Sequence, residues 1–184
     1  GRDNDVVSFW TYVVAALNAT VDGVGAVALS MLRSPQPQIE QALASLLNDL
    51  GAARNDVVLV LDDYHFIEST DVQDGVACLL EHLPPQTQLV IASRADPALP
   101  LARLRAQGDL IEIRGADLRF TADEAAEYLN VVMGLSLTAQ DVAALEGRTE
   151  GWIAALQLAA LSMQGRADVA GLSLIHISEP TRLL

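Results

Sequence analysis

Residues 57–65 read VVLVLDDYH, in which five apolar residues run directly into two carboxylates. A short, continuous, valine-rich run of this kind is typical of a strand buried on both faces of a parallel sheet. Ligands bind at the carboxyl ends of the strands in open α/β sheets. The stretch therefore predicts a strand that presents Asp62 and Asp63 at the ligand-binding edge of such a sheet.

A hydrophobic strand that ends in two carboxylates has the chemistry of a Walker B motif. One carboxylate, here Asp62, holds Mg²⁺ beside the nucleotide phosphates, and the second, Asp63, orients or polarises the attacking water. Two alternatives remain open at this point. The two aspartates could simply serve a turn or a cap, or Asp62, Asp63 and His65 could bind the divalent metal of a hydrolase.

The following apolar run adds a cation at a comparable position. Residues 89–94 read LVIASR, which predicts a second buried strand that ends next to Arg94. A planar guanidinium grips phosphate oxygens through two hydrogen bonds, so Arg94 suits a sensor of the γ-phosphate. The alternative is a surface arginine that pairs with Asp96.

Strands alternate with helices in the first part of the chain, which predicts an α/β fold with a parallel sheet flanked by helices. Helices are expected at 9–19, 38–50, 71–82 and 101–106, and strands at 57–61, 89–92 and 110–113. Thr70 and Gln73 have the spacing of a capping box for the third of these helices.

After Arg119 the pattern becomes entirely helical. Thr121 and Glu124 form a second capping box, and helices are expected at 121–132, 138–145 and 151–163. Trp152 has the spacing of a core anchor in the last of them. We therefore expect a core at residues 1–117 and a small helical lid at 118–171.

The composition limits which partners this chain is expected to bind. The net charge is −13, and all eleven basic residues are arginine. Nucleic-acid binding depends on cationic neutralisation of phosphates, so this acidic chain is expected to bind DNA poorly by itself. The single cysteine, Cys78, is expected to be a small buried apolar residue. No apolar run approaches the roughly 18 residues of a membrane span, so we expect no membrane partner and a cytoplasmic location.

Several motifs together resemble the ATP-binding domain of LuxR-type, MalT-like bacterial transcriptional regulators, a group of STAND NTPases related to AAA+ proteins. The order and spacing match over nearly all of residues 1–171. The matching stretches are Ser8–Trp10, Ala15–Leu17, Leu59–His65, Ile91–Pro97, Leu99–Arg105, Asp117–Thr121 and Arg148–Ala154.

The resemblance implies a partial P-loop NTPase fold and a slow regulatory ATPase as the parent protein. It implies ATP and Mg²⁺ as cofactors, self-association of the activated protein, and DNA binding only through a C-terminal helix-turn-helix that this chain lacks. The family's phosphate-binding loop contains a lysine, and this chain has none. We therefore expect a fragment that is inactive on its own. A non-enzymatic interaction domain remains the other alternative.

The last residues do not fit this pattern. Residues 172–182 read LSLIHISEPTR, which resembles the translation of a transposase adapter used to build sequencing libraries. Residues 172–184 are therefore expected to be an artefact outside the fold.

Overall fold

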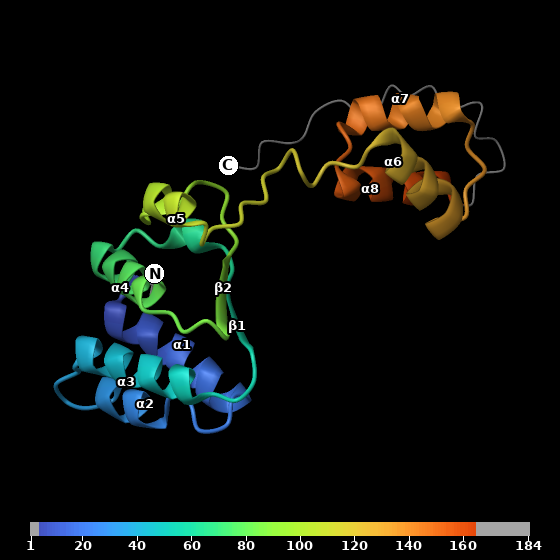
Figure 1. Ribbon diagram of the computed structural model, residues 1–184. Helices are drawn as coiled ribbons and strands as arrows, with labels where there is room; N and C mark the ends of the chain where they lie inside the picture. Colours follow the sequence, from blue (N-terminus) through green and yellow to red (C-terminus); the bar gives the residue numbers. More distant parts are fainter. Residues whose placement is uncertain (1–3, 165–184) are drawn as a thin grey trace. The chain divides into compact units, whose positions relative to one another are not determined.

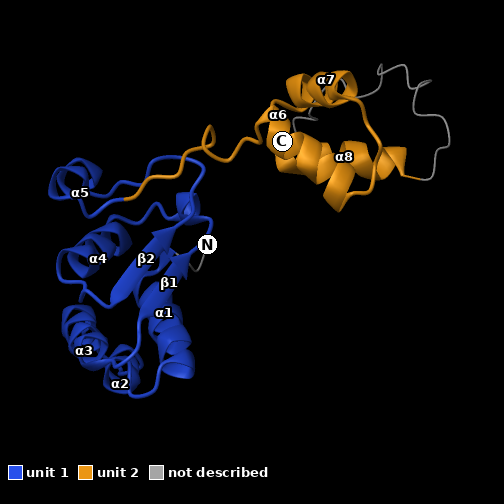
Figure 2. Ribbon diagram, turned by 45° about the vertical axis from the view of Figure 1, so that its right-hand side comes forward, with its two compact units in different colours: residues 1–110 blue, residues 111–184 orange. Residues whose placement is uncertain are grey.

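The computed structural model describes residues 4–164, so the expected adapter segment lies outside the described residues. The chain divides into two compact units, Gly1–Leu110 and Ile111–Leu184 (Figure 2). The expected boundary at residue 117 therefore lies inside the second unit. No helix in the described range is long and apolar enough to cross a membrane.

The first unit is a helical layer packed on a two-stranded parallel sheet (Figure 1). Each residue of β1 pairs with one of β2, from Val57 opposite Thr87 to Leu61 opposite Ile91. This confirms the α/β class and the two strands predicted on either side of a helix. The elements are α1 (Val6–Thr20), α2 (Ala26–Leu32), α3 (Ile39–Ala52), β1 (Val57–Leu61), α4 (Thr70–Glu81), β2 (Thr87–Ile91) and α5 (Leu101–Gln107).

Side-chain caps set the starts of two of these helices. The Asp5 carboxylate accepts a hydrogen bond from the Ser8 amide at 2.8 Å and begins α1. Hydrogen bonding to the side chain and then to the backbone amide of Ser8 lowers the pKa of Asp5. Helix α4 is capped by Ser69, whose hydroxyl accepts from the Val72 amide. The expected capping box of Thr70 and Gln73 is therefore wrong, because the cap lies one residue earlier.

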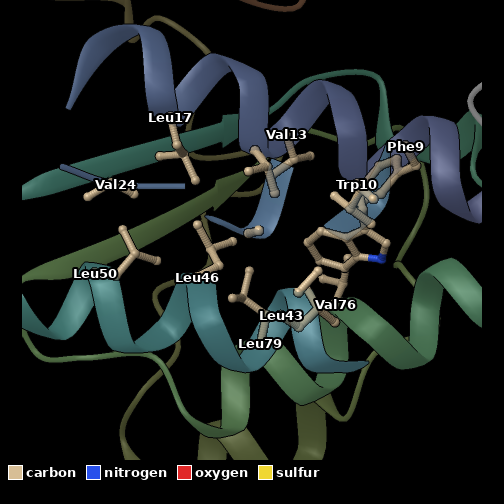
Figure 3. Packing of buried hydrophobic residues seen from close by; sticks show 14 of the residues in the cluster. Phe9, Trp10, Val13, Leu17, Val24, Leu43, Leu46, Leu50, Val76 and Leu79 are labelled. Atoms are coloured by element: carbon tan, nitrogen blue, oxygen red, sulfur yellow. The ribbon is translucent and has the colours of Figure 1, made fainter. Parts of the chain in front are cut away.

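The core of the first unit lies between the helices and one face of the sheet. Trp10 and Leu46 are almost fully buried, and they meet Val76 and Leu79 of α4 (Figure 3). The strands contribute alternate residues, such as Leu59 and Leu89, to this cluster. Helices α1, α3 and α4 thus support the strands from one side.

The opposite face of the sheet is not covered in the described residues. Val58 is 57% exposed, Val60 58% and Val90 45%. The prediction of strands buried on both faces is therefore wrong. Side chains alternate across a strand, and the described helices pack against only one of the two faces.

The predicted third strand at 110–113 is also wrong. These residues lie outside any helix or strand, and Ile111 is 90% exposed and Ile113 68%. A strand is stabilised by hydrogen bonds to a neighbouring strand. In the described sheet, β1 and β2 pair only with each other.

The second unit is a small helical bundle. Thr121 and Glu124 form the predicted capping box of α6, and Thr138 forms one with Asp141 at α7. Its elements are α6 (Ala122–Glu127), a π-helical turn (Tyr128–Val132), α7 (Ala139–Thr149) and α8 (Ile153–Met163). Leu129 and Leu156 are fully buried at the centre of this bundle.

Two side chains differ from expectation in their burial. Trp152 is the N-cap residue of α8 and is 42% exposed, so it is not a core anchor. Cys78 is exposed, although it lies within α4 as expected. Spacing along a helix places a residue on a face, but the packing partners decide which face is buried.

Candidate functional site

The two aspartates follow the end of β1 directly, and both are exposed. Asp62 turns back on its own backbone, since its Oδ1 accepts a hydrogen bond from the Asp63 amide at 2.8 Å. Asp63 adopts φ 51° and ψ 34°, the left-handed region, at the start of a 3₁₀ turn over Tyr64–Phe66. Left-handed backbone is unusual for a residue with a side chain and is often found at functional sites.

Backbone hydrogen bonds hold the ends of the two strands together. The Ala92 amide donates to the Leu61 carbonyl at 2.9 Å, and the Tyr64 amide donates to the Ala92 carbonyl at 3.0 Å. The parallel register therefore continues past the strands. As a result, the loops that carry Asp62, Asp63 and the exposed Arg94 leave the sheet at the same edge.

The loop after the aspartates is fixed by a residue from the start of the chain. Asn4 donates from Nδ2 to the Phe66 carbonyl at 2.9 Å. Its Oδ1 accepts from the amides of Glu68 at 2.7 Å and Ser69 at 3.0 Å. The sequence offered no signal for Asn4, because its partners lie 62 to 65 residues away.

The two residues after Asp63 are mostly or fully buried. His65 stacks on Phe66 with ring centroids 4.2 Å apart, and its Nδ1 lies 3.8 Å from Asp63 Oδ1. The Tyr64 hydroxyl is buried without a hydrogen-bond partner in the described part of the chain. Burial raises the pKa of Tyr64 to about 12. Tyr64 is therefore neutral at physiological pH and anchors the loop through packing.

The exposed groups at this edge suit a magnesium–phosphate ligand. Carboxylate oxygens are preferred by Mg²⁺, which is often held by one or two carboxylates together with substrate phosphates. Between residues 4 and 164 there is no cluster of three or more His, Cys, Asp or Glu side chains that could hold a metal ion.

The chain is similar to parts of much longer bacterial proteins. It is 32% identical over 187 residues to the HTH-type transcriptional regulator MalT of Serratia proteamaculans, and 30% identical over 186 residues to MalT of Klebsiella pneumoniae. Each alignment covers 96% of this chain and 21% of the relative. It is also 40% identical over 130 residues to the serine/threonine-protein kinase PknK of Mycobacterium tuberculosis, over 71% of the chain and 12% of that protein. No protein-family model matches.

The fold and the strand-end carboxylates define a partial α/β NTPase-like domain. With similarity over nearly its whole length, the chain belongs to the family of MalT-like, LuxR-type regulators, and corresponds to their NTPase-domain region. It spans about a fifth of the length of the MalT relatives.

Proposed function

We propose that this chain is part of an ATP-dependent signalling switch in a transcriptional activator, and that Asp62, Asp63 and Arg94 are its nucleotide-facing residues. The observation that carries the proposal is the common edge from which the loops of these residues leave the sheet. The alignment to MalT over 96% of the chain supports it.

Each residue has a role that fits its chemistry. Asp62 would bind Mg²⁺, because a carboxylate is a hard oxygen ligand. Asp63, whose side chain is 61% exposed, would orient the hydrolytic water. Arg94 would contact the γ-phosphate through its planar guanidinium. ATP with Mg²⁺ supplies the phosphoanhydride whose cleavage would switch the parent protein off.

The whole protein's other activities follow only from the relatives. DNA binding would reside in a separate helix-turn-helix, since this acidic chain carries a charge of −13. Self-association of the ATP-bound protein would bring several such modules to one promoter. The absence of lysine means that this chain supplies no P-loop lysine, so we expect it to bind nucleotide weakly.

The proposal is testable on this chain by NMR titration with Mg²⁺–ATP. Losing several phosphate contacts, each worth about 1.5–3 kcal/mol, leaves an affinity in roughly the millimolar range, which NMR detects. Shifts are expected at Asp62, Asp63 and Arg94. Substituting Mn²⁺ should broaden the signals of the two aspartates selectively.

Matched variants distinguish the loss of a specific ligand contact from a general change in net charge. Asp62→Asn should remove the Mn²⁺ broadening, and Arg94→Gln should weaken ATP binding severalfold. Asp22→Asn and Arg33→Gln, at exposed charges in the turns around α2, should leave both unchanged. If Mn²⁺–ATP broadens no signal near residue 62, the proposal is wrong. If Mn²⁺ alone binds there as tightly without nucleotide, the metal-hydrolase alternative replaces it.

A further inference from the structure

Two segments of the second unit that are about thirty residues apart meet in the structure. The Phe120 amide donates a hydrogen bond to the Gly151 carbonyl at 2.8 Å. The Phe120 ring also packs edge-to-face on Tyr128, with centroids 5.8 Å apart. The segment that leads into α6 is therefore hydrogen-bonded to the turn between α7 and α8.

This attachment depends on glycine at position 151. Gly151 has a φ of +71°, and a Cβ atom there would lie 2.5 Å from the Phe120 carbonyl oxygen and 3.1 Å from its nitrogen. Both the left-handed backbone and the close approach exclude any larger residue without displacement. Glycine at position 151 therefore allows the backbone of residue 120 to lie against this turn.

Side chains reinforce the backbone contact. Arg119 Nη2 lies 3.1 Å from Glu150 Oε2, and its guanidinium carbon lies 6.0 Å from the centre of the Trp152 ring. The same ring is 3.7 Å from the place of a Cβ on Gly115. The side chain of Arg119 is 46% exposed and that of Glu150 65%, and exposed ion pairs are weak. These contacts can therefore break without disturbing the buried core.

Residues 108–113 come just before this segment and include exposed apolar side chains. Gly108 ends α5 in the left-handed region, and Ile111 and Ile113 are mostly exposed outside any helix or strand. By contrast, Arg114 and Asp117 close a turn, since the Arg114 amide donates to Asp117 Oδ2 at 2.7 Å.

We propose that residues 114–120 and the α7–α8 turn at 149–152 form a latch that sets how much of the segment joining the two units can extend. The Asp109 amide donates to the Leu104 carbonyl at 3.0 Å, so with the latch closed only residues 110–113 can extend. Their fully extended span is at most about 14 Å. With the latch open, residues 114–120 join this segment, and its fully extended span rises to about 40 Å. The latch is a conformational device that operates whether or not the first unit binds nucleotide.

Thermolysin tests the latch within a ten-residue stretch, because it cleaves before large apolar residues such as Ile111, Ile113 and Phe120. Proteolysis of a native protein tracks the population of the locally open state. In the unmodified chain, cleavage before Ile111 or Ile113 should be at least about tenfold faster than cleavage before Phe120. Equal rates at these bonds would overturn the proposal.

Two variants weaken the latch in different ways. Arg119→Gln removes the ion pair and the ring contact and should accelerate cleavage before Phe120 severalfold, with the rate before Ile111 unchanged. Gly151→Ala should have a larger effect. Gly147→Ala is the matched control, because a Cβ there meets nothing within 4 Å, and it should leave the rate before Phe120 unaltered.

Amide exchange at the buried Leu145 and Leu156 distinguishes opening of the latch from a general loss of structure. Their protection should persist in Arg119→Gln, since its contacts lie outside the core. If Gly151→Ala loses this protection, Arg119→Gln alone decides the matter. An Arg119→Gln chain with cleavage before Phe120 as slow as in the unmodified chain would refute the latch.

Discussion

At the scale of single residues, the Tyr64 hydroxyl group is buried without a hydrogen-bond partner among the described residues. The side chain of Tyr64 is 3% exposed, and no described residue hydrogen-bonds to the hydroxyl. A buried, unsatisfied polar group lowers stability by about 1–3 kcal/mol. We expect Tyr64→Phe to raise the free energy of unfolding at pH 7 by about 1 kcal/mol, measured by urea denaturation.

The same residue should make stability depend on alkaline pH. Burial raises the pKa of Tyr64 to about 12 from an ordinary value of 10.0. Between these two values the unfolded chain ionises the phenol and the folded chain does not. The ionisation of Tyr64 therefore does not affect the free energy of unfolding below pH 10. As the pH rises from 10 towards 12, the free energy of unfolding falls. The Tyr64→Phe chain should lose less stability over this range; an identical loss in both chains would contradict the burial of the hydroxyl.

Gly75 shows how one missing side chain allows a large one to fit. A Cβ at Gly75 would lie 2.9 Å from two atoms of the buried Trp10 ring. Glycine to alanine in a helix normally stabilises by about 1 kcal/mol, but overpacking a core costs about 1–3 kcal/mol. We expect Gly75→Ala to be destabilising, as measured by thermal unfolding. Gly51→Ala in α3, where nothing lies within 4 Å, should instead be neutral or stabilising.

At the scale of elements, we expect the sheet face that the described residues leave uncovered to favour self-association of this chain. Val58 and Val60 project from β1 on that face. Exposed apolar sheet surface promotes association between molecules. We expect the double change Val58→Thr and Val60→Thr to reduce light scattering at high protein concentration. Its thermal unfolding should be nearly unchanged, because threonine keeps the branched shape that strands favour.

The same substitution on the other face of β1 is the control. Val57 is 4% exposed and belongs to the core. Val57→Thr buries a hydroxyl group and should lower the free energy of unfolding by about 1–3 kcal/mol. If Val57→Thr is tolerated while the double change unfolds the chain, the assignment of the two faces is reversed.

At the scale of the whole molecule, two separate cores predict two separate unfolding events. Leu46 and Leu156 are both fully buried, one in each cluster. Truncating a buried leucine to alanine costs about 2–5 kcal/mol. Leu46→Ala should therefore lower amide protection in residues 4–110 only, and Leu156→Ala in residues 111–164 only. Loss of protection in both units from either change would mean that they unfold as one.

Much of the local structure was predictable from residue patterns. The apolar runs at 57–61 and 89–91 are strands, the box at Thr121 begins a helix, and a helix follows Thr138 as expected. Helix α2 was missed: its Gly25 amide is bonded to the Asp49 side chain, which lies 24 residues away. The π-helical turn at Tyr128–Val132 was also missed, because its sequence has the pattern of an ordinary α-helix.

The sequence by itself determined the α/β class, both strands and the position of two aspartates and an arginine after strand ends, because these depend on local apolar patterns. Only the tertiary structure decided which face of the sheet is covered, that residues 110–113 remain unpaired, and that residues 119 and 120 meet residues 150–152. The reason is physical: a strand, a covered face and a backbone contact each require partners far away in the chain, and local propensity carries no information about where those partners lie.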